Sequence, residues 1–567
     1  MRLLTYFISG CIAVFLSLIA VQGVFAYQSS LPNNKFGIHL AQPHDSDIKR
    51  AAALVNGSGG DWGYITLVMQ ENDRDTNKWQ GVFDQLRKYH LIPIIRLATQ
   101  PEGSVWKRPT EDDVDGWVSF LNSLNWVVKD RYIILFNEPN HATEWGGSVN
   151  AVQYAHVAEA FAQKLKETNR DYFPMIAGLD ASAPQELPSY SDEAQFLQQV
   201  VQTIGSEKFN ALFDGLSSHS YPNPGFVGSD DGNGRGSIRT YQWEEHILNS
   251  WGVKKLPVFI TETGWDGVRL SRQQVADDFE HAYLYVWLPD NQVVAVTPFV
   301  LNYQGDPFLP FSWVTPGENG VYPQYDRIEE LPKEQGKPEI IQNGNFSTDL
   351  PAELVEQSHY TFPILVTNTG QGYWNPKQGY SLALKGIDQK QYSFTTLPPM
   401  GPNESREITL NISTGAMIGN HDVVIQVLNG TDVVLQSTHW KFSIVPLPSL
   451  TLKVNLYPKL SADGTDYGVQ IFDEKEHIVF EQNGVVVKNN SAHINGVANI
   501  ALGRPYRIVV RKVPYLPRQT IILFTQGENK VTMKRMYPLD YTGDGAFTID
   551  DVWAFLRHPR LVSFFFP

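Results

Sequence analysis

The sequence predicts a multidomain protein: a (β/α)₈ TIM barrel, then two β-sandwich-like domains, then a short EF-hand-like segment at the C-terminus. Three observations carry this prediction. From about residue 35 to 331, short apolar runs alternate with longer amphipathic runs. From residue 359 onward, short alternating runs are separated by turn residues, and near the C-terminus acidic residues recur at a loop-like spacing. At 567 residues the chain is also too long for one ordinary domain.

The first 26 residues have the pattern of an export signal. Arg2 precedes an apolar run over residues 3–21, and Val24-Phe25-Ala26 follows as a small-residue cleavage pattern. We therefore expect a secreted or cell-surface protein, with this segment as its only membrane contact if it stays attached as an anchor. The single cysteine, Cys11, lies inside the segment, so the rest of the chain depends on hydrophobic cores rather than disulfides.

Residues 27–335 are predicted to form the barrel. Parallel strands are buried on both faces, so they are expected as near-continuous apolar stretches. Such stretches occur at 36–40, 64–69, 92–97, 132–136, 174–179, 211–217, 257–261 and 293–301. Helical patterns lie between them, at 79–89, 151–169, 193–204, 241–251 and 271–286, with a weak one near 324–331. A doubly wound sheet is the rival, but no Gly-rich nucleotide fingerprint follows the first strand.

Two β-rich domains are predicted after the barrel. At 350–446, short alternating runs with turn residues between them favour an Ig-like sandwich. Pro446-Leu447-Pro448 is typical of a stiff linker, and residues 449–535 contain a second set of short strands. Within that second set, residues 503–510 (Gly-Arg-Pro-Tyr-Arg-Ile-Val-Val) loosely resemble transthyretin-like and carboxypeptidase-regulatory-like modules.

Two glutamates stand at the ends of predicted barrel strands. The fourth strand runs into Asn137-Glu138-Pro139-Asn140, and the seventh runs into Glu262-Thr263-Gly264-Trp265. The 124 residues between the glutamates accommodate three βα units, which agrees with this strand numbering. In such barrels the loops after the strands build the active site, so both carboxylates are expected at the open end.

A pair of carboxylates in this position has a specific chemical use. Cleavage of a glycosidic bond needs one acid to protonate the leaving oxygen and a second carboxylate on the opposite side of the sugar. The retaining mechanism needs the two groups about 5–5.5 Å apart. The sequence does not give the distance between Glu138 and Glu262, so the expected function, an exported retaining glycoside hydrolase of a polysaccharide or oligosaccharide with no cofactor for its chemistry, requires the fold to bring them that close.

The two strings also resemble a known group of enzymes. Asn137-Glu138-Pro139 together with Glu262 resembles clan A of the glycoside hydrolases. The string Phe-Asn-Glu-Pro-Asn is similar to families 5, 39 and 128, and Thr-Glu-Thr-Gly-Trp is similar to families 17 and 53. The resemblance covers residues 36 to about 315. It implies that Glu138 is the acid/base, Glu262 the nucleophile, and Asn137 a ligand of the sugar 2-hydroxyl.

Four more side chains are candidate site residues. Ser218-His219-Ser220-Tyr221-Pro222 resembles the clan's His-x-Tyr, which implies that Tyr221 donates to the nucleophile and His219 lines the cleft. A core histidine bonded to backbone is the alternative for His219. Arg96 closes the third strand and His39 the first. An arginine beside the nucleophile would lower its pKa, and the alternative is a structural ion pair.

Three tryptophans are candidate stacking platforms for sugar rings: Trp145, Trp265 and Trp313. A sugar needs a flat apolar face with a polar edge, which an indole provides. Trp313 follows the eighth strand, where the clan often places a tryptophan under the reacting sugar. Ordinary packing within loops is the alternative for all three.

Residues 536–567 contain a predicted calcium loop. Asp540 to Asp551 match the EF-hand loop at positions 1, 3, 5, 6 and 12. The ligands would be side-chain oxygens of Asp540, Thr542, Asp544 and Asp551 and the carbonyl of Ala546. With the apolar helix that begins at Val552, the loop resembles one half of a type I dockerin. That resemblance implies a structural Ca²⁺ and a cohesin-like or cell-surface partner.

The sequence disfavours several other functions. A net charge of −15 opposes nucleic acid as a partner. His39 and His44 lack a third ligand for catalytic zinc. Two alternatives to a hydrolase stay open: a non-catalytic carbohydrate-binding or cell-surface adhesion protein, and a transglycosylase that uses identical residues.

Overall fold

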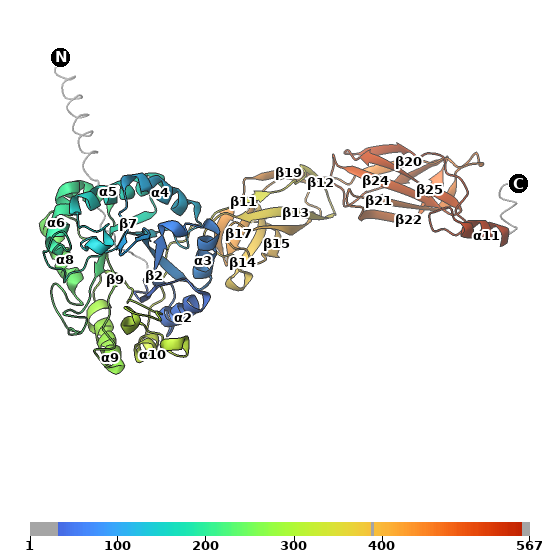
Figure 1. The fold of residues 1–567 in the computed structure, drawn as a ribbon. Coiled ribbons are helices and arrows are strands. Elements are labelled where there is room, and N and C mark those ends of the chain that lie inside the picture. The colour runs from blue at the N-terminus through green and yellow to red at the C-terminus, as the bar shows by residue number, and fades with distance from the viewer. Residues whose placement is uncertain (1–31, 387–389, 558–567) are drawn as a thin grey trace, which may run out of the picture. The chain divides into compact units, whose positions relative to one another are not determined.

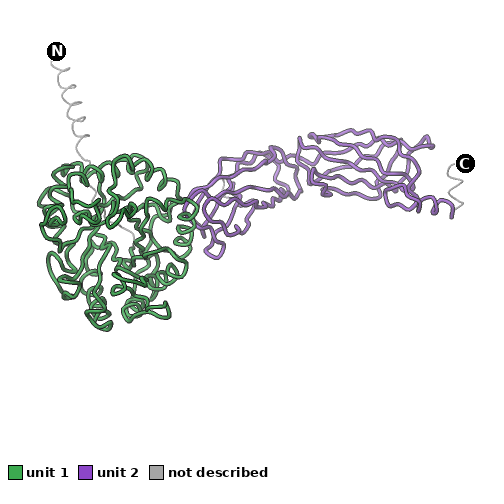
Figure 2. Tube along the Cα trace, viewed as in Figure 1, with its two compact units in different colours: residues 1–341 green, residues 342–567 purple. Residues whose placement is uncertain are grey.

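The computed structural model describes residues 32–386 and 390–557. The chain separates into two compact units, Met1–Ile341 and Gln342–Pro567 (Figure 2). The predicted export segment, residues 1–26, lies outside the described residues. Within the described ranges, no helix combines the length and the apolarity that crossing a bilayer requires.

In the described part of the first unit, eight parallel strands follow one another in a ring (Figure 1). One sheet contains β1 (Gly37–Leu40), β2 (Gly63–Gln70), β3 (Leu91–Ala98), β6 (Arg131–Leu135) and β7 (Tyr172–Ile176). The other contains β8 (Leu216–His219), β9 (Val258–Glu262) and β10 (Val293–Val296). Parallel bridges from Met175 to Gly215 and from Phe36 to Val296 join the sheets at both edges. The ring is therefore closed, as the sequence predicts, whereas a doubly wound sheet would have open edges.

Helices follow the strands in alternation. They are α2 (Asp45–Asn56), α3 (Thr76–Lys88), α4 (Val114–Ser123), α5 (Ala151–Thr168), α6 (Glu193–Ile204), α7 (Ser206–Leu212), α8 (Thr240–Ser250), α9 (Arg272–Ala282) and α10 (Pro323–Glu330). Capping side chains fix several starts, because the carboxylate of Asp75 accepts from the first amides of α3 and the hydroxyl of Ser271 accepts from an amide of α9. One prediction is corrected: residues 211–212 end α7 instead of opening a strand.

The interior of the ring is filled with aromatic side chains. Tyr132 and Phe259 come from opposite sheets, and their ring centroids are 5.1 Å apart. Phe173 packs against both, at 5.1 Å from Tyr132 and 5.6 Å from Phe259. All three are buried. The barrel is thus a packed core and not a pore, and only its open end is free to build a site.

The second unit begins with two facing sheets. One consists of β11 (Gly344–Ser347), β13 (His359–Asn368) and β16 (Ser405–Ser413). The other consists of β12 (Glu353–Val355), β19 (Trp440–Val445), β17 (Gly419–Asn429), β14 (Tyr380–Gly386), β15 (Gln391–Thr396) and β18 (Asp432–Gln436). Buried and exposed side chains alternate along β13, and both sheets contribute to one core. This is a sandwich architecture.

The next region is also β-rich, but its hydrogen bonding differs from that of a sandwich. In sheet order, its strands are β25 (Tyr515–Leu523), β24 (Pro505–Lys512), β21 (Gly464–Phe472), β22 (Ile478–Lys488), β23 (Ser491–Ile494), β20 (Ser449–Lys453) and β26 (Glu528–Thr532). They form one sheet, because β22 pairs with β21 along one edge and, at Val487 and Lys488, with β23 along the other. The sandwich-like prediction is corrected here to one sheet with one core. Helix α11 (Ile549–Arg557) follows.

Candidate active site

Glu138 and Glu262 both lie at the carboxyl ends of ring strands. Glu262 is the last residue of β9, and Glu138 follows β6 by three residues. The backbone turns sharply after β6, since Phe136 and Glu138 have φ values of 75° and 33°, in the left-handed region that side chains rarely adopt. Such strain persists only where the surroundings enforce it, which marks this turn as a functional candidate.

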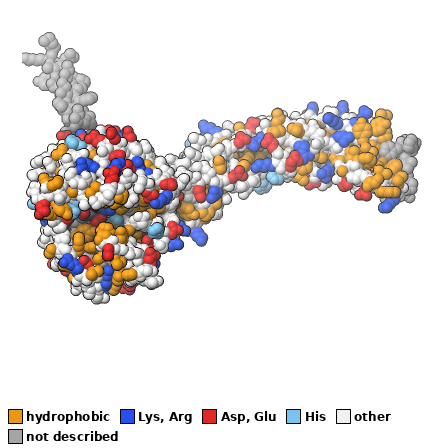
Figure 3. Space-filling view, viewed as in Figure 1, with side chains coloured by type: hydrophobic (Ala, Val, Ile, Leu, Met, Phe, Trp, Pro, Cys, Tyr) orange, Lys and Arg blue, Asp and Glu red, His pale blue; other side chains and the backbone are white. Residues whose placement is uncertain are grey.

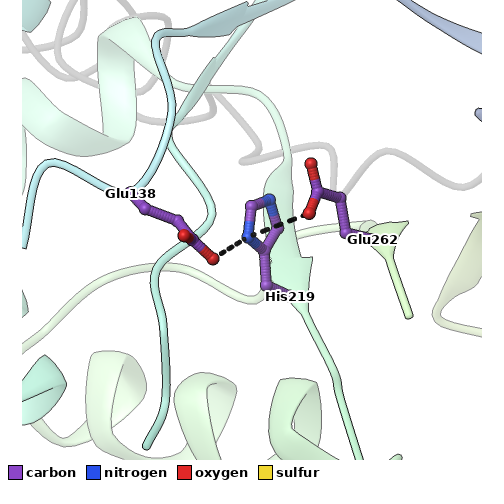
Figure 4. A group of neighbouring side chains, drawn as sticks. All are labelled: Glu138, His219 and Glu262. Atoms are coloured by element: carbon purple, nitrogen blue, oxygen red, sulfur yellow. Dashed lines mark hydrogen bonds and ion pairs between the residues drawn. The ribbon is translucent and has the colours of Figure 1, made fainter. Parts of the chain in front are cut away.

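His219, the last residue of β8, lies between the two carboxylates (Figure 4). Its Nδ1 is 2.8 Å from Oε1 of Glu138 and 3.8 Å from Oε2 of Glu262. Gly178 makes room for the ring, because a Cβ on that residue would lie 2.2 Å from Cδ2 of His219. The two glutamates that the sequence singles out therefore meet in one place, with one imidazole shared between them.

Glu262 is surrounded by groups that favour its ionised form. The guanidinium of Arg96, from β3, donates to Oε1, and the hydroxyl of Tyr221 donates to Oε2 at 3.0 Å. Burial alone would raise the pKa of Glu262. The positive charges of His219 and Arg96, the His39 ring and the Tyr221 hydrogen bond outweigh burial and lower it. Glu262 is therefore held as a carboxylate.

The pKa values of the two histidines of the site are shifted in opposite directions. Burial would lower the pKa of His219, but the charges of Glu262 and Glu138 and the bond to Glu138 raise it. For His39, burial and the nearby Arg96 charge lower the pKa to about 3. His39 is 1% exposed, its Nε2 lies 4.0 Å from Oε1 of Glu262, and neither ring nitrogen forms a hydrogen bond. The surroundings thus favour the cationic form of His219 and the neutral form of His39.

Asn137 connects the two sides of the site. Its Oδ1 accepts from Nη1 of Arg96 at 2.6 Å, and its Nδ2 donates to Oε2 of Glu144 at 3.2 Å. The structure therefore brings Asn137, Glu138, His219, Tyr221, Arg96, His39 and Glu262 together at the open end of the ring.

The three tryptophans that were predicted to stack on sugar rings are buried in the structure. Trp145 is 0% exposed, and Trp265 and Trp313 are each 1% exposed. Trp145 packs edge-on against Tyr154, and the other two pack against Phe279. None of the three indoles offers a ring face to a sugar, so this prediction is wrong and the alternative of loop packing holds.

Other aromatic side chains stand closer to the site. Phe299 follows β10 and lies 5.1 Å, centroid to centroid, from the ring of His39. Phe311 contacts Phe299 and Tyr221, and Phe226 contacts Tyr221 at 5.0 Å. These phenylalanines are partly exposed. The sequence does not reveal them, because no local pattern distinguishes a phenylalanine beside a site from one in a core.

Glu144 is the other residue that sequence analysis missed. It ends η3 (Ala142–Glu144), a short turn in the loop after β6, six residues beyond Glu138. Its position in a loop at the open end was a usable signal, but the direction of its side chain could not be read from the sequence.

The donor atoms of the site suit proton transfer better than metal binding. Within the described residues, Glu138, His219 and Glu262 are the one group of at least three acidic, histidine or cysteine ligands whose atoms all lie within 4.8 Å of one another. Oε1 of Glu262 already accepts from Arg96 and Oε2 from Tyr221. A cation here would lie beside a guanidinium and displace these bonds, which is unfavourable.

The predicted calcium loop is folded by its own backbone. Oδ1 and Oδ2 of Asp540 accept from the amides of Gly543 and Gly545, at 2.8 and 3.1 Å. Asp551 accepts from the amides of Thr542 and Thr548, at 2.9 and 2.7 Å. Asp540 and Asp551 are 3% and 1% exposed, so both carboxylates point into the loop, as an EF-hand loop requires. The residues present fit a calcium ion.

Apolar side chains gather at the surface around this loop and α11 (Figure 3). Phe547, Ile549, Trp553 and Leu556 are each more than half exposed.

Comparison with known proteins yields only distant likeness. No protein-family model and no curated protein matches the chain. Similar solved structures include a family 39 glycoside hydrolase from Bacteroides cellulosilyticus WH2, with 14% identity, covering 67% of this chain and 80% of that one, at a TM-score of 0.38. An endo-β-1,4-glucanase from Xanthomonas axonopodis pv. citri has 11% identity, covering 52% and 97%, at 0.35. A family 51 α-L-arabinofuranosidase from Bifidobacterium longum has 9% identity, covering 59% and 78%, at 0.34.

Proposed function

We propose that this chain is a retaining glycoside hydrolase of polysaccharides or oligosaccharides, with Glu138 as acid/base and Glu262 as nucleophile. One observation carries the proposal: oxygens of Glu138 and Glu262 and a nitrogen of His219 all lie within 4.8 Å of one another. Retaining enzymes need their carboxyl groups about 5–5.5 Å apart, whereas inverting enzymes need about 6.5–9.5 Å to admit a water. The separation here supports direct attack by a carboxylate on the sugar.

In the first step of the proposed reaction, protonated Glu138 gives its proton to the glycosidic oxygen as that oxygen leaves the anomeric carbon. A carboxylate oxygen of Glu262 attacks the same carbon from the opposite face, and a covalent glycosyl-enzyme ester forms. In the second step, Glu138 takes a proton from water, the water oxygen attacks the anomeric carbon, and Glu262 leaves as a carboxylate. Two inversions restore the original configuration.

The surrounding groups support these roles. Arg96 and Tyr221 keep Glu262 ionised, as a nucleophile must be. His219 bonds to Glu138 and faces Glu262, so it helps to fix the positions of the two carboxyl groups relative to each other.

A transglycosylase would use the same first step and differ only in the acceptor. If a sugar hydroxyl replaces water in the second step, the product is a new glycoside. Glu138 would then take the proton from that hydroxyl, with the same atoms and the same geometry. Product analysis at high glycoside concentration separates the two activities.

The remaining expectations from the sequence are proposals of the same kind. Residues 1–26 would export the chain or anchor it at the cell surface. The loop from Asp540 to Asp551 would bind a structural Ca²⁺, and the apolar surface around α11 would offer a place for a cohesin-like or cell-surface partner.

Variants of the two glutamates test the proposed function. The protein, Glu262→Ala, Glu138→Ala and the control Glu330→Gln, an exposed residue of α10, are assayed on 4-nitrophenyl β-glycosides and on plant and microbial glycans. We expect Glu262→Ala to lose activity at least about 10³-fold and Glu138→Ala to lose activity about 10²- to 10⁴-fold, with the activity of Glu330→Gln unchanged.

Added azide distinguishes the roles of the two glutamates. It should yield a β-glycosyl azide with Glu138→Ala and an α-glycosyl azide with Glu262→Ala. Full activity in Glu262→Ala would refute the nucleophile, and no activity of the wild type on any glycan would favour the non-catalytic alternative.

A further inference from the structure

A third carboxylate, that of Glu144, lies beside the two proposed catalytic ones. Its Oε2 accepts from Nδ2 of Asn137 at 3.2 Å, and Oδ1 of the same amide accepts from Arg96. The guanidinium of Arg96 in turn donates to Glu262. An unbroken series of polar contacts therefore runs from Glu144 to the proposed nucleophile.

This series fixes the orientation of the Asn137 amide. A guanidinium can only donate hydrogen bonds, and an ionised carboxylate can only accept them. Arg96 on one side therefore requires the oxygen of the amide, and Glu144 on the other side requires its nitrogen. Without Glu144, the Asn137 amide nitrogen would lose its partner, and the amide could turn.

Glu144 also lines a pocket next to the proposed catalytic pair. The pocket lies where β2, β3 and β6 end, and its polar and aromatic lining consists of Arg96, Thr99, Trp106, Phe136, Asn137 and Glu144. Asn137 and Arg96 belong both to this pocket and to the contacts of Glu262. The pocket has a volume of about 40 Å³, so it has room for a hydroxyl group of a sugar held at the proposed catalytic centre but not for a sugar ring.

The two walls of the pocket are tied to each other. Trp106 ends β5 (Val105–Trp106), which forms a hairpin with β4 (Pro101–Glu102), and its carbonyl accepts from the amide of Gly146 at 3.0 Å. The guanidinium of Arg108 donates to the carbonyl of Trp145 at 3.0 Å. Trp145, wrongly predicted to stack on a sugar, is instead the buried residue that anchors the Glu144 turn.

The charge balance of this corner favours a neutral ligand. Three carboxyl groups, from Glu138, Glu144 and Glu262, lie near two basic groups, and both basic groups already have partners: Arg96 bonds to Glu262, and His219 bonds to Glu138. Burial, and the negative charges of Glu138 and Glu262, raise the pKa of Glu144. A further anionic group in the pocket would be repelled, whereas a hydroxyl could donate to the Glu144 carboxylate.

We propose that Glu144 is a specificity-determining and positioning residue: it orients Asn137 and accepts a hydroxyl of a neutral sugar in the Trp106-lined pocket, so that uronic acid residues are rejected. The inference rests on the proposed function for its substrate class. It does not depend on turnover, because a bound sugar should place its hydroxyl group in the pocket whether or not a bond is cleaved.

Binding therefore tests the proposal. The probes are hydrolysis-resistant 4-nitrophenyl 1-thio-β-glycosides of glucose, galactose, mannose and xylose, together with the matching glucuronide. They are titrated by calorimetry into the full chain and into Glu144→Ala, Glu144→Gln and the control Glu102→Ala. Glu102 is an exposed glutamate of the neighbouring β4–β5 hairpin and lies outside the pocket lining. Thermal unfolding of each variant verifies that it is folded.

For the tightest neutral probe, we expect Glu144→Ala to weaken binding about 10- to 100-fold, the range for a hydrogen bond to a charged group. Glu144→Gln keeps an acceptor for Asn137 and should bind that probe within about threefold of the wild type, as should Glu102→Ala. The glucuronide should bind the wild type more weakly than the glucoside and gain affinity in Glu144→Gln.

Three results would overturn the proposal: no neutral probe binds the wild type, Glu144→Ala binds as the wild type does, or the glucuronide binds as tightly as the glucoside. Turnover is scored separately on the oxygen-linked glycosides. A wild type that binds as expected but cleaves nothing refutes the hydrolase and leaves the pocket assignment intact. Cleavage that is unaffected by Glu144→Ala, with unchanged binding, refutes the pocket assignment alone.

Discussion

Two sets of carboxylates in this chain are held in opposite ways. In the barrel, Glu262 is held by Arg96 of β3, His219 of β8 and Tyr221 of the loop after β8, which lie 41 or more residues away. In the C-terminal loop, Asp540 and Asp551 accept from amides at most nine residues away. The first arrangement exists only when the ring closes, whereas the second is local. Breaking one should therefore affect chemistry, and breaking the other only local stability.

Among substitutions outside the two proposed catalytic glutamates, the largest expected effect comes from removing the guanidinium of Arg96, which contacts Glu262. Arg96→Gln leaves Glu262 buried without its guanidinium partner and frees the oxygen of Asn137. We expect kcat/KM on an accepted glycoside to fall on the order of 10²- to 10³-fold, because a preorganised charge next to the reacting atoms is lost. Steady-state kinetics measure the loss, and a change of less than about threefold would contradict the assigned role.

Gly178→Ala should have the next largest effect. The new methyl group would lie 2.2 Å from the His219 ring, so the imidazole must move away from the two carboxylates. We expect destabilisation of about 1–3 kcal/mol, the usual range for overpacking, and a clear loss of activity. Denaturant unfolding and kinetics measure the two effects. The matched substitution Gly81→Ala, on α3 where a methyl group would meet nothing within 4 Å, should cost neither.

The barrel site shows which functional residues the sequence could reveal and which it could not. Glu138 and Glu262 were predictable because each directly follows an apolar strand, and strand ends meet at the open end of a barrel. Tyr221 and Arg96 follow the same logic, and both contact Glu262. The prediction that the three tryptophans stack on sugar rings was wrong, because the local sequence around a loop tryptophan does not show whether the indole is buried or exposed. Glu144 was missed for the same reason, since only the fold turns its side chain inward.

The sequence predicted the arrangement of the barrel strands better than the strand pairing of the second β-rich region. Continuous apolar runs such as that of β6 indicate strands buried on both faces, and the ring follows from their alternation with helices. In the last β-region, the sequence indicated where the strands lie but not how they pair. There, β22 pairs with β21 along one edge and with β23 along the other. Pairing register of this kind is set by contacts distant in sequence, which no local pattern encodes.

The pH dependence of the proposed reaction tests whether the distant contacts of Glu262 keep it ionised. The pKa of Glu262 is lowered in the folded protein, so its ionised form persists below its ordinary value of 4.5. The stability that this ionised form contributes is complete above 4.5 and is lost as the pH falls through the lower folded value. Tyr221→Phe removes one donor to Glu262 and should move the acid limb of kcat/KM to higher pH. An unchanged or lower acid limb in the variant would contradict the contact.

The smallest expected effect belongs to the local loop. Added Ca²⁺ should raise the unfolding midpoint of the C-terminal region by a few degrees, and Asp540→Ala should abolish that shift, since binding to the folded state stabilises it. Asp550→Ala, an exposed neighbour of the proposed ligand Asp551, is the control and should keep the shift. Turnover by the barrel should not change in either variant. A loss of activity on adding chelator would show that the two carboxylate sets are coupled, contrary to this account.

The most direct test of the central claim is the configuration of the first product. Proton NMR follows the anomeric signal while the protein cleaves an accepted β-glycoside, before mutarotation mixes the anomers. Two carboxylates with oxygens within 4.8 Å predict that the β-anomer appears first. If the α-anomer appeared first, a water molecule rather than Glu262 would be the attacking group, and the account of the site would be wrong.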